Sequence, residues 1–220
     1  MVDLVLIMGI LLFSVMIHEC AHGWVALLCG DDTAKREGRL SLNVIMHVDL
    51  VGTIVLPLVL LFLYLMSGSG IIFGWAKPVP VRAGRLRNPS RDYALVSLAG
   101  PVSNIVLAIV FGSMVPFSMM IFRDHSILSA IARCAFLGVK VNIILGMFNL
   151  IPVPPLDGSH VLAYVLPPSL SIRYQRMARY GMVIILVLIL TGALEYPFLI
   201  AESISDGIVK WMYTIGRFFG

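Results

Sequence analysis

Long apolar runs separated by short polar segments dominate the hydrophobic pattern of the chain. The runs cover Leu4–Cys29, Leu50–Met66, Tyr93–Phe122, Ile127–Ile151, Tyr180–Leu194 and, with an amphipathic pattern, Tyr196–Phe219. A helix needs about 20 apolar residues to cross the hydrocarbon core of a bilayer, and several runs approach or exceed that length. The pattern therefore predicts an all-α polytopic membrane protein with about five to six membrane helices.

Several residues interrupt this helical pattern. The third run contains Gly100–Pro101, which predicts an early break, and the second run is broken by Ser67–Gly70. Polar and apolar residues alternate over Gly38–Val44, which favours a short strand. The two prolines in Trp75–Val81 allow only an edge strand or an extended segment. We therefore expect a small membrane-embedded strand or re-entrant segment beside the helices.

The composition supports the membrane class. Of the 220 residues, 59% are hydrophobic and 13% are charged, whereas soluble domains carry about 25% charged residues. The net charge of +4 is ordinary for a protein with basic cytoplasmic loops, and nothing indicates nucleic-acid binding. The three cysteines form no C-x-x-C pair, so we expect no disulfide framework. No repeat or linker divides the chain, and we expect a single domain over residues 1–220.

One motif in the first run carries catalytic chemistry. His18, Glu19 and His22 form the pattern H-E-x-x-H, in which the two histidines lie one helical turn apart on one face. Both imidazoles can then reach one metal ion while Glu19 handles protons, as in zinc metalloproteases. Ionisable groups inside a membrane helix are energetically costly and therefore indicate function. The alternative is a structural polar kink packed against neighbouring helices.

A third metal ligand must come from another segment, because catalytic zinc sites normally have three protein ligands and one open position. Asp157 follows a proline-broken run, where irregular backbone at membrane depth must line a cavity. A role for Asp157 as a turn-former before Gly158 is equally compatible with the sequence. His160 is a rival ligand whose direction the turn leaves open. His125 and His47 are interpreted as polar loop residues.

Taken together, the His18–His22 motif and the segment Asn149–Gly158 resemble the site-2 protease family of intramembrane zinc metalloproteases. Further segments resemble a compact prokaryotic branch of that family, without PDZ or CBS domains, and these are Gly38–Asn43, Gly74–Val81 and Ser97–Asn104. The resemblance implies one zinc ion per chain, held by His18, His22 and Asp157, with Glu19 as the catalytic base.

The resemblance also implies contacts with a substrate. Asn149 and the pair Pro154 and Pro155 would lie beside the cleft and help to seat an unwound segment. Asn104 is a further candidate for substrate binding, with helix packing as its alternative role. The implied substrate is a membrane protein with a transmembrane helix, cleaved by regulated intramembrane proteolysis in the lipid bilayer. The implied location is the bacterial or archaeal cell membrane, with multiple passes.

Basic residues predict the topology. The loops Lys77–Arg91 and Arg173–Arg179 are the most basic and are expected in the cytoplasm. If His18 and His22 share a metal with Asp157, the end of the first run faces the same side and Met1 lies outside. The run Leu50–Phe73 would then enter the membrane and return as a hairpin. Whether residues 50–73 and 196–219 fully span the membrane is left open.

A second class of function uses the same residues. A metal-ion transporter could take His18, His22 and Asp157 as a transit site, and a non-catalytic membrane scaffold is a third possibility. Transporters tend to contain internal repeats, and the sequence shows none. A general base such as Glu19 is also superfluous for transport. Substitution of Glu19 by glutamine separates the classes, since it should stop proteolysis but leave transport largely intact.

Overall fold

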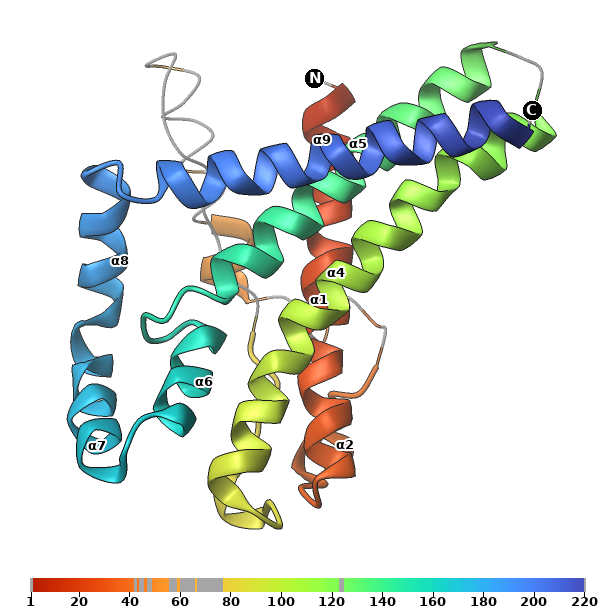
Figure 1. The fold of residues 1–220 in the computed structure, drawn as a ribbon. Coiled ribbons are helices and arrows are strands. Elements are labelled where there is room, and N and C mark those ends of the chain that lie inside the picture. Colours follow the sequence, from red (N-terminus) through yellow and green to blue (C-terminus); the bar gives the residue numbers. More distant parts are fainter. Residues whose placement is uncertain are drawn as a thin grey trace.

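The computed structural model describes residues 2–41, 43, 46, 49–55, 59, 66, 77–122 and 125–219, and within them the protein is helical (Figure 1). The long helices are α1 (Val2–Leu28), α4 (Pro89–Ile121), α5 (His125–Asn149) and α9 (Glu195–Phe219). The shorter helices are α2 (Thr33–Arg36), α6 (Asp157–Val165), α7 (Pro168–Arg176) and α8 (Gly181–Leu190). Single turns of other helix types occur at η2 (Leu50–Val55), η3 (Ala83–Arg85) and η4 (Met177–Tyr180).

Small residues bring α4, α5 and α9 close together. Ala108 on α4, Val139 on α5 and Ala201 on α9 are fully buried in one cluster. A side chain on Gly138 would collide with the ring of Phe111, at 2.2 Å from its nearest atom. Helices in a bilayer associate through such close packing, because lipid supplies little hydrophobic driving force between them. The small residues therefore explain how α9 lies across α4 and α5 (Figure 1).

The expected break at Gly100–Pro101 is wrong. Helix α4 runs without interruption through both Pro101 and Pro116. Proline removes one backbone donor, but membrane helices tolerate it where neighbouring groups satisfy the freed carbonyls. Here Pro101 is fully buried in the helix bundle. Packing against the neighbouring helices thus outweighs the local preference of the proline for a break.

Among the described residues, three helices are long and apolar enough to cross a membrane, namely Val5–Leu28, Pro89–Ile121 and Ser126–Asn149. The pair Pro168–Leu190 and Glu195–Phe218, bent by 74°, raises the number to four if it forms one span. The described residues thus support a helical membrane protein but not the expected number of five to six membrane helices. Helix α8 is short, and a positive φ of 71° at Gly192 accommodates the turn into α9.

The expected hairpin falls largely on residues outside the described ranges, whereas most of the expected strand is described. Within the described part of Gly38–Val44 the backbone forms no strand. Most of Leu50–Phe73 is not described, and its described start forms the turn η2. Residues 77–82 are extended, as the two prolines predict, although no strand pairing is present in the described part of the chain.

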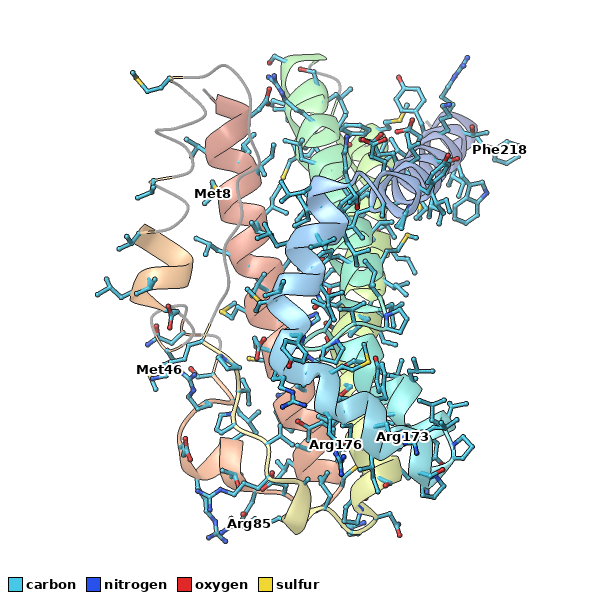
Figure 2. The ribbon with its side chains drawn as sticks, turned by 90° about the vertical axis from the view of Figure 1, so that its left-hand side faces the viewer. Met8, Met46, Arg85, Arg173, Arg176 and Phe218 are labelled. Carbon is cyan, nitrogen blue, oxygen red and sulfur yellow. The ribbon has the colours of Figure 1, made fainter. Side chains whose placement is uncertain are left out.

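The basic loops gather at one end of the molecule. Arg85, Arg173 and Arg176 lie toward the same end, whereas Met8 lies toward the other (Figure 2). The backbone N–H of Arg87 donates to the carbonyl oxygen of Cys29 at 3.0 Å, so the end of α1 joins this basic end. The arrangement agrees with the expectation that these loops share one side of the membrane, and the identity of that side stays a prediction.

Candidate metal centre

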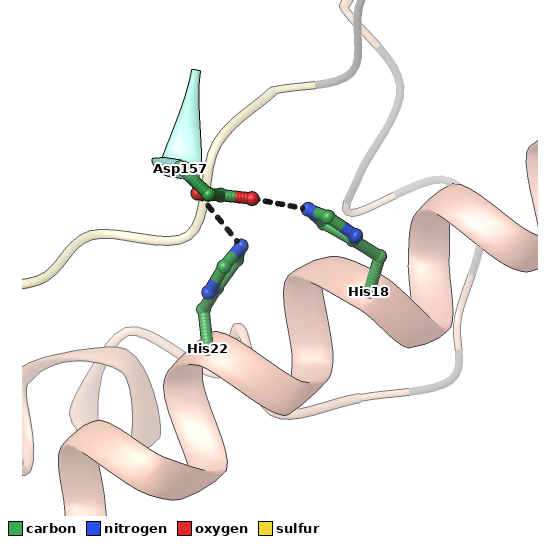
Figure 3. Close-up of side chains that lie close together, drawn as sticks. All are labelled: His18, His22 and Asp157. Carbon is green, nitrogen blue, oxygen red and sulfur yellow. Dashed lines mark ion pairs between the residues drawn. The ribbon is translucent and has the colours of Figure 1, made fainter. Parts of the chain in front are cut away.

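His18, His22 and Asp157 converge on one point between α1 and α6 (Figure 3). Each offers one ligand atom, and these atoms lie within 4.8 Å of one another. His18 Nε2 is 3.1 Å from Asp157 Oδ2, and His22 Nε2 is 3.4 Å from Asp157 Oδ1. The structure thus brings together the three residues that the sequence suggested, from segments more than a hundred positions apart in the chain.

A short loop places Asp157 in this cluster. Helix α5 ends at Asn149, the chain turns through residues 150–156, and α6 begins at Asp157 itself. A Cβ atom on Gly158 would lie 2.1 Å from the carbonyl oxygen of Leu150, so only glycine lets α6 start this close to the loop. The glycine fixes where the helix begins, and the first residue of that helix is the carboxylate facing α1.

The hydrogen bonds behind the histidines fix which ring nitrogen carries a proton. His22 Nδ1 lies 2.6 Å from the carbonyl oxygen of Val96, which only accepts, so Nδ1 donates. His18 Nδ1 likewise donates to Asn104 Oδ1 at 2.7 Å. In the neutral rings both Nε2 atoms then present lone pairs toward Asp157.

This donor set fits a metal ion. Two imidazole lone pairs and a carboxylate face one another, and a cation is the species that satisfies all of them at once. Asp157 Oδ2 is buried and has no hydrogen-bond partner among the described residues, and the nearest nitrogen of His18 lies 3.1 Å away. Two histidines and one carboxylate are a ligand set found in catalytic zinc sites. The residues present therefore fit zinc.

Gly100 keeps the space in front of the two histidines open. A Cβ atom at this position would lie 2.5 Å from Nε2 of His18 and 2.5 Å from Nε2 of His22. At this point α4 has no side chain, so its backbone can pass close to the ligand atoms of His18 and His22. Any larger residue would occupy the space where a metal ion meets the imidazoles.

Glu19 lies next to the cluster but outside the set of three ligand residues. Its Oε2 accepts a hydrogen bond from the backbone N–H of Val79 at 2.8 Å. Arg39 is buried and donates from Nη2 to the carbonyl oxygens of Lys77 and Pro78, at 3.3 and 3.1 Å. Arg39 thus holds the extended segment on the N-terminal side of its contact with Glu19.

Asp31 anchors the other end of this segment. Its Oδ2 accepts the backbone N–H of Arg82 at 2.6 Å, and its Oδ1 accepts both the N–H and the hydroxyl of Thr33. Burial alone would raise the pKa of Asp31, but the hydrogen bonds from Thr33 and Arg82 outweigh it and lower the pKa below 3.8. The carboxylate of Asp31 therefore stays ionised at neutral pH and holds the extended segment at Arg82.

The other predicted site residues lie around the cluster. Asn104 is fully buried on α4, directly behind His18. Asn149 donates from Nδ2 to the carbonyl oxygen of Leu145 in the last turn of α5. Pro154 is buried and lies against Gly181 at the start of α8, whereas Pro155 is exposed. Their role in substrate binding stays a prediction.

The remaining histidines do not join the ligand set among the described residues. The ring of His160 packs edge-on against Tyr93, with centroids 4.7 Å apart. His125 is the first residue of α5, and its side chain is not described; His47 lies outside the described residues.

Sequence reasoning missed Asn142, Gly100 in its steric role, and the backbone N–H of Val79. A signal existed for Asn142, because an amide side chain in the middle of an apolar membrane helix needs a partner. No comparable signal existed for Val79, since a backbone donor leaves no mark in the residue pattern.

The chain resembles known proteins over most of its length. Residues 112–191 match the family model described as Peptidase family M50. Several relatives carry the name "Putative zinc metalloprotease", among them YwhC, Rip2 and MJ0611. YwhC of Bacillus subtilis is 37% identical over 212 residues, covering 93% of this chain and 90% of its own. Rip2 of Mycolicibacterium smegmatis is 30% identical over 221 residues, covering 94% of this chain and 78% of its own. MJ0611 of Methanocaldococcus jannaschii is 39% identical over 69 residues, covering 31% of this chain and 32% of its own. No solved structure matches the chain.

The match to YwhC extends over both segments that form the cluster, and the family model covers the segment with Asp157. The protein is therefore a metalloprotease, and it belongs to peptidase family M50, the site-2 protease family.

Proposed function

We propose that the protein is an intramembrane zinc endopeptidase of the cell membrane that cleaves membrane proteins within or near their transmembrane segments, as in regulated intramembrane proteolysis. The observation that carries this proposal is the cluster of His18, His22 and Asp157 within a bundle of membrane-type helices. A hydrolytic centre built into such helices can reach peptide bonds that soluble proteases cannot.

In this proposal the zinc ligands are Nε2 of His18, Nε2 of His22 and the carboxylate of Asp157. When bound, the zinc ion supplies Lewis-acid activation of the scissile carbonyl and of the attacking water. The protein holds the three ligand side chains in place through α1 and α6, and Gly100 leaves room for the ion.

Glu19 is the proposed base. Its Oε2 is engaged by the Val79 N–H, which orients the carboxylate and leaves Oε1 to accept the proton of the attacking water. The same carboxyl then returns this proton to the nitrogen of the leaving amine as the C–N bond breaks. Proton transfer by a positioned side chain typically contributes about 10²- to 10⁴-fold to the rate.

The substrate must be locally unwound, because an intact helix keeps its carbonyl groups in internal hydrogen bonds. Asn149 and the loop with Pro154 and Pro155 are the proposed contacts for such a segment. The amide of Asn149 now donates to Leu145, and it would exchange this bond for one to a substrate carbonyl.

Comparison of membrane fragments in cells tests the proposal. Cells producing the wild type, Glu19→Gln or Glu37→Gln are compared by mass spectrometry of membrane peptides. Glu37 is an exposed carboxylate in the loop after α2 and serves as the matched control. We expect fragments ending inside apolar segments in the wild type and in Glu37→Gln, and their absence in Glu19→Gln with unchanged zinc content. Identical fragments in all three strains would refute proteolysis, and zinc flux retained in Glu19→Gln would favour transport.

A further inference from the structure

Behind His18, a chain of buried amides crosses from α4 to α5. Asn104 Oδ1 lies 2.7 Å from His18 Nδ1, and Asn104 Nδ2 lies 3.0 Å from Asn142 Oδ1. The chain ends on the backbone, where Asn142 Nδ2 donates to the carbonyl oxygen of Gly138 at 2.9 Å. Both asparagines have an exposed fraction of 0%, so water does not compete for these bonds.

The direction of every bond in this chain follows from its last acceptor. A carbonyl oxygen only accepts, so the group of Asn142 that faces Gly138 is the NH₂, and its oxygen faces Asn104. Asn104 must then donate its own NH₂ to Asn142 and present its oxygen to His18. His18 consequently carries its proton on Nδ1, and in the neutral ring Nε2 is left with a lone pair toward Asp157.

The two histidines are therefore fixed by different means. His22 donates to a helix carbonyl of α4, at Val96, which cannot rotate. His18 donates to an amide side chain, and an amide can turn by 180° and offer a donor in place of an acceptor. Within the described part of the chain, the second amide, Asn142, is the group that holds the Asn104 amide against that rotation.

We propose that Asn142 is a positioning residue for the metal centre, which through Asn104 sets the tautomer and ring orientation of His18 so that Nε2 binds the metal. The inference rests on the proposed zinc site. It also assigns Asn104 to positioning His18, in place of the substrate contact expected from the sequence, because both ends of its amide are already engaged.

Without Asn142, the amide of Asn104 is free to turn. Its NH₂ would then face His18 Nδ1, which favours the tautomer with the proton on Nε2. That tautomer has no lone pair to offer a metal at Nε2, so zinc must displace the proton and turn the amide back. Loss of a group that orients a metal-binding histidine typically lowers metal affinity by roughly 10- to 100-fold.

Four variants test the inference. Asn142→Leu removes both polar atoms, and Asn142→Ala repeats the test without added bulk should the leucine variant fail to fold. Asn142→Asp is the conservative variant, because a buried carboxylic acid keeps its proton and still donates to Gly138 while accepting from Asn104. Ser14→Ala is the matched control, since Ser14 Oγ is fully buried one turn before His18 and has no partner among the described residues.

Two quantities are measured on purified full-length protein. The zinc dissociation constant is obtained by competition with a chelating dye. The tautomer of His18 is read from ring ¹⁵N chemical shifts of the metal-free protein, with His18→Gln for assignment. We expect a roughly 10- to 100-fold weaker zinc affinity and a proton on Nε2 in Asn142→Leu. Asn142→Asp and Ser14→Ala should keep the wild-type tautomer and affinity.

Wild-type zinc affinity and an Nδ1 proton in Asn142→Leu would overturn the inference that Asn142 acts on His18 through Asn104. Equal losses of zinc affinity in Asn142→Leu and Asn142→Asp would overturn it as well. Failure of the proposed function has a different signature. The wild type itself would then bind no zinc or release no fragments. The tautomer of His18 in the metal-free protein would still test whether Asn142 and Asn104 position its ring.

Discussion

Val79 donates its backbone N–H to Oε2 of Glu19 across 2.8 Å. The donor lies between Pro78 and Pro80, and proline has no backbone N–H. The Pro-Val-Pro sequence therefore presents a single main-chain donor at this point of the extended segment, and that donor meets the proposed base. The contact links a segment held by Arg39 and Asp31 to the chemistry at the end of α1.

Removing this donor should impair turnover but not metal binding. Val79→Pro deletes the N–H and leaves Glu19 less well oriented, so we expect kcat to fall by about tenfold, a fraction of the total contribution of a general base. Val79→Ala keeps the N–H and is the matched control, with near-wild-type kcat. Steady-state cleavage and zinc content are measured together. An unchanged kcat in Val79→Pro would show that the contact has no role in catalysis.

A methyl group at position 100 should destroy the metal centre. In Gly100→Ala the new Cβ would lie 2.5 Å from both Nε2 atoms, and the two rings are held from behind by bonds of 2.7 and 2.6 Å. We expect loss of zinc and of cleavage, measured by metal analysis of the purified protein. Gly9→Ala on α1 adds the same methyl group with no atom within 4 Å and should retain zinc. One bound zinc per chain in Gly100→Ala would contradict the geometry.

The sequence predicted the parts of the site that depend on local spacing. His18 and His22 face the same way because four residues make about one helical turn, and α1 follows the first apolar run closely. The position of Asp157 depended instead on the course of residues 150–156 and on the close approach allowed by Gly158. Such a turn is set by tertiary packing, so the sequence left open whether Asp157 was a ligand or a turn-former, and His160 stayed a rival ligand until the fold separated them.

Helix α4 shows the limit of local rules. Gly100–Pro101 predicts a break in an isolated chain, yet the helix continues because α4 is packed against α1 and α5. The same continuity places Gly100 over the histidines and Asn104 behind His18, four residues along the same helix. The partners of Asn142 likewise depend on the packing of α5 against α4, which no spacing in the sequence reveals.

Asp31 should stabilise the fold in a pH-dependent way. Its pKa is lowered in the folded protein, so its contribution is present above the ordinary value of 3.8 and is lost as the pH falls below it. Asp31→Asn should reduce the free energy of unfolding at pH 7 by about 1–3 kcal/mol, through loss of hydrogen bonds to a charged group. The difference from the wild type should shrink as the pH drops through 3.8. Thermal melting across this range provides the measurement.

Asp32→Asn is the control for Asp31. Asp32 forms only part-exposed ion pairs with Arg36 and Arg85, so its loss should change stability by about 0–1 kcal/mol. A destabilisation of Asp31→Asn that stays constant from pH 7 to below 3.8 would contradict the assignment of the lowered pKa.

The central claim is that His18, His22 and Asp157 hold one zinc ion. Anomalous diffraction from crystals of the zinc-loaded protein, collected on both sides of the zinc absorption edge, tests it most directly. We predict a single zinc peak at about 2.0–2.2 Å from Nε2 of His18, Nε2 of His22 and a carboxylate oxygen of Asp157. A zinc peak that lacks Asp157 as a ligand, or that lies on His160 instead, would contradict the account.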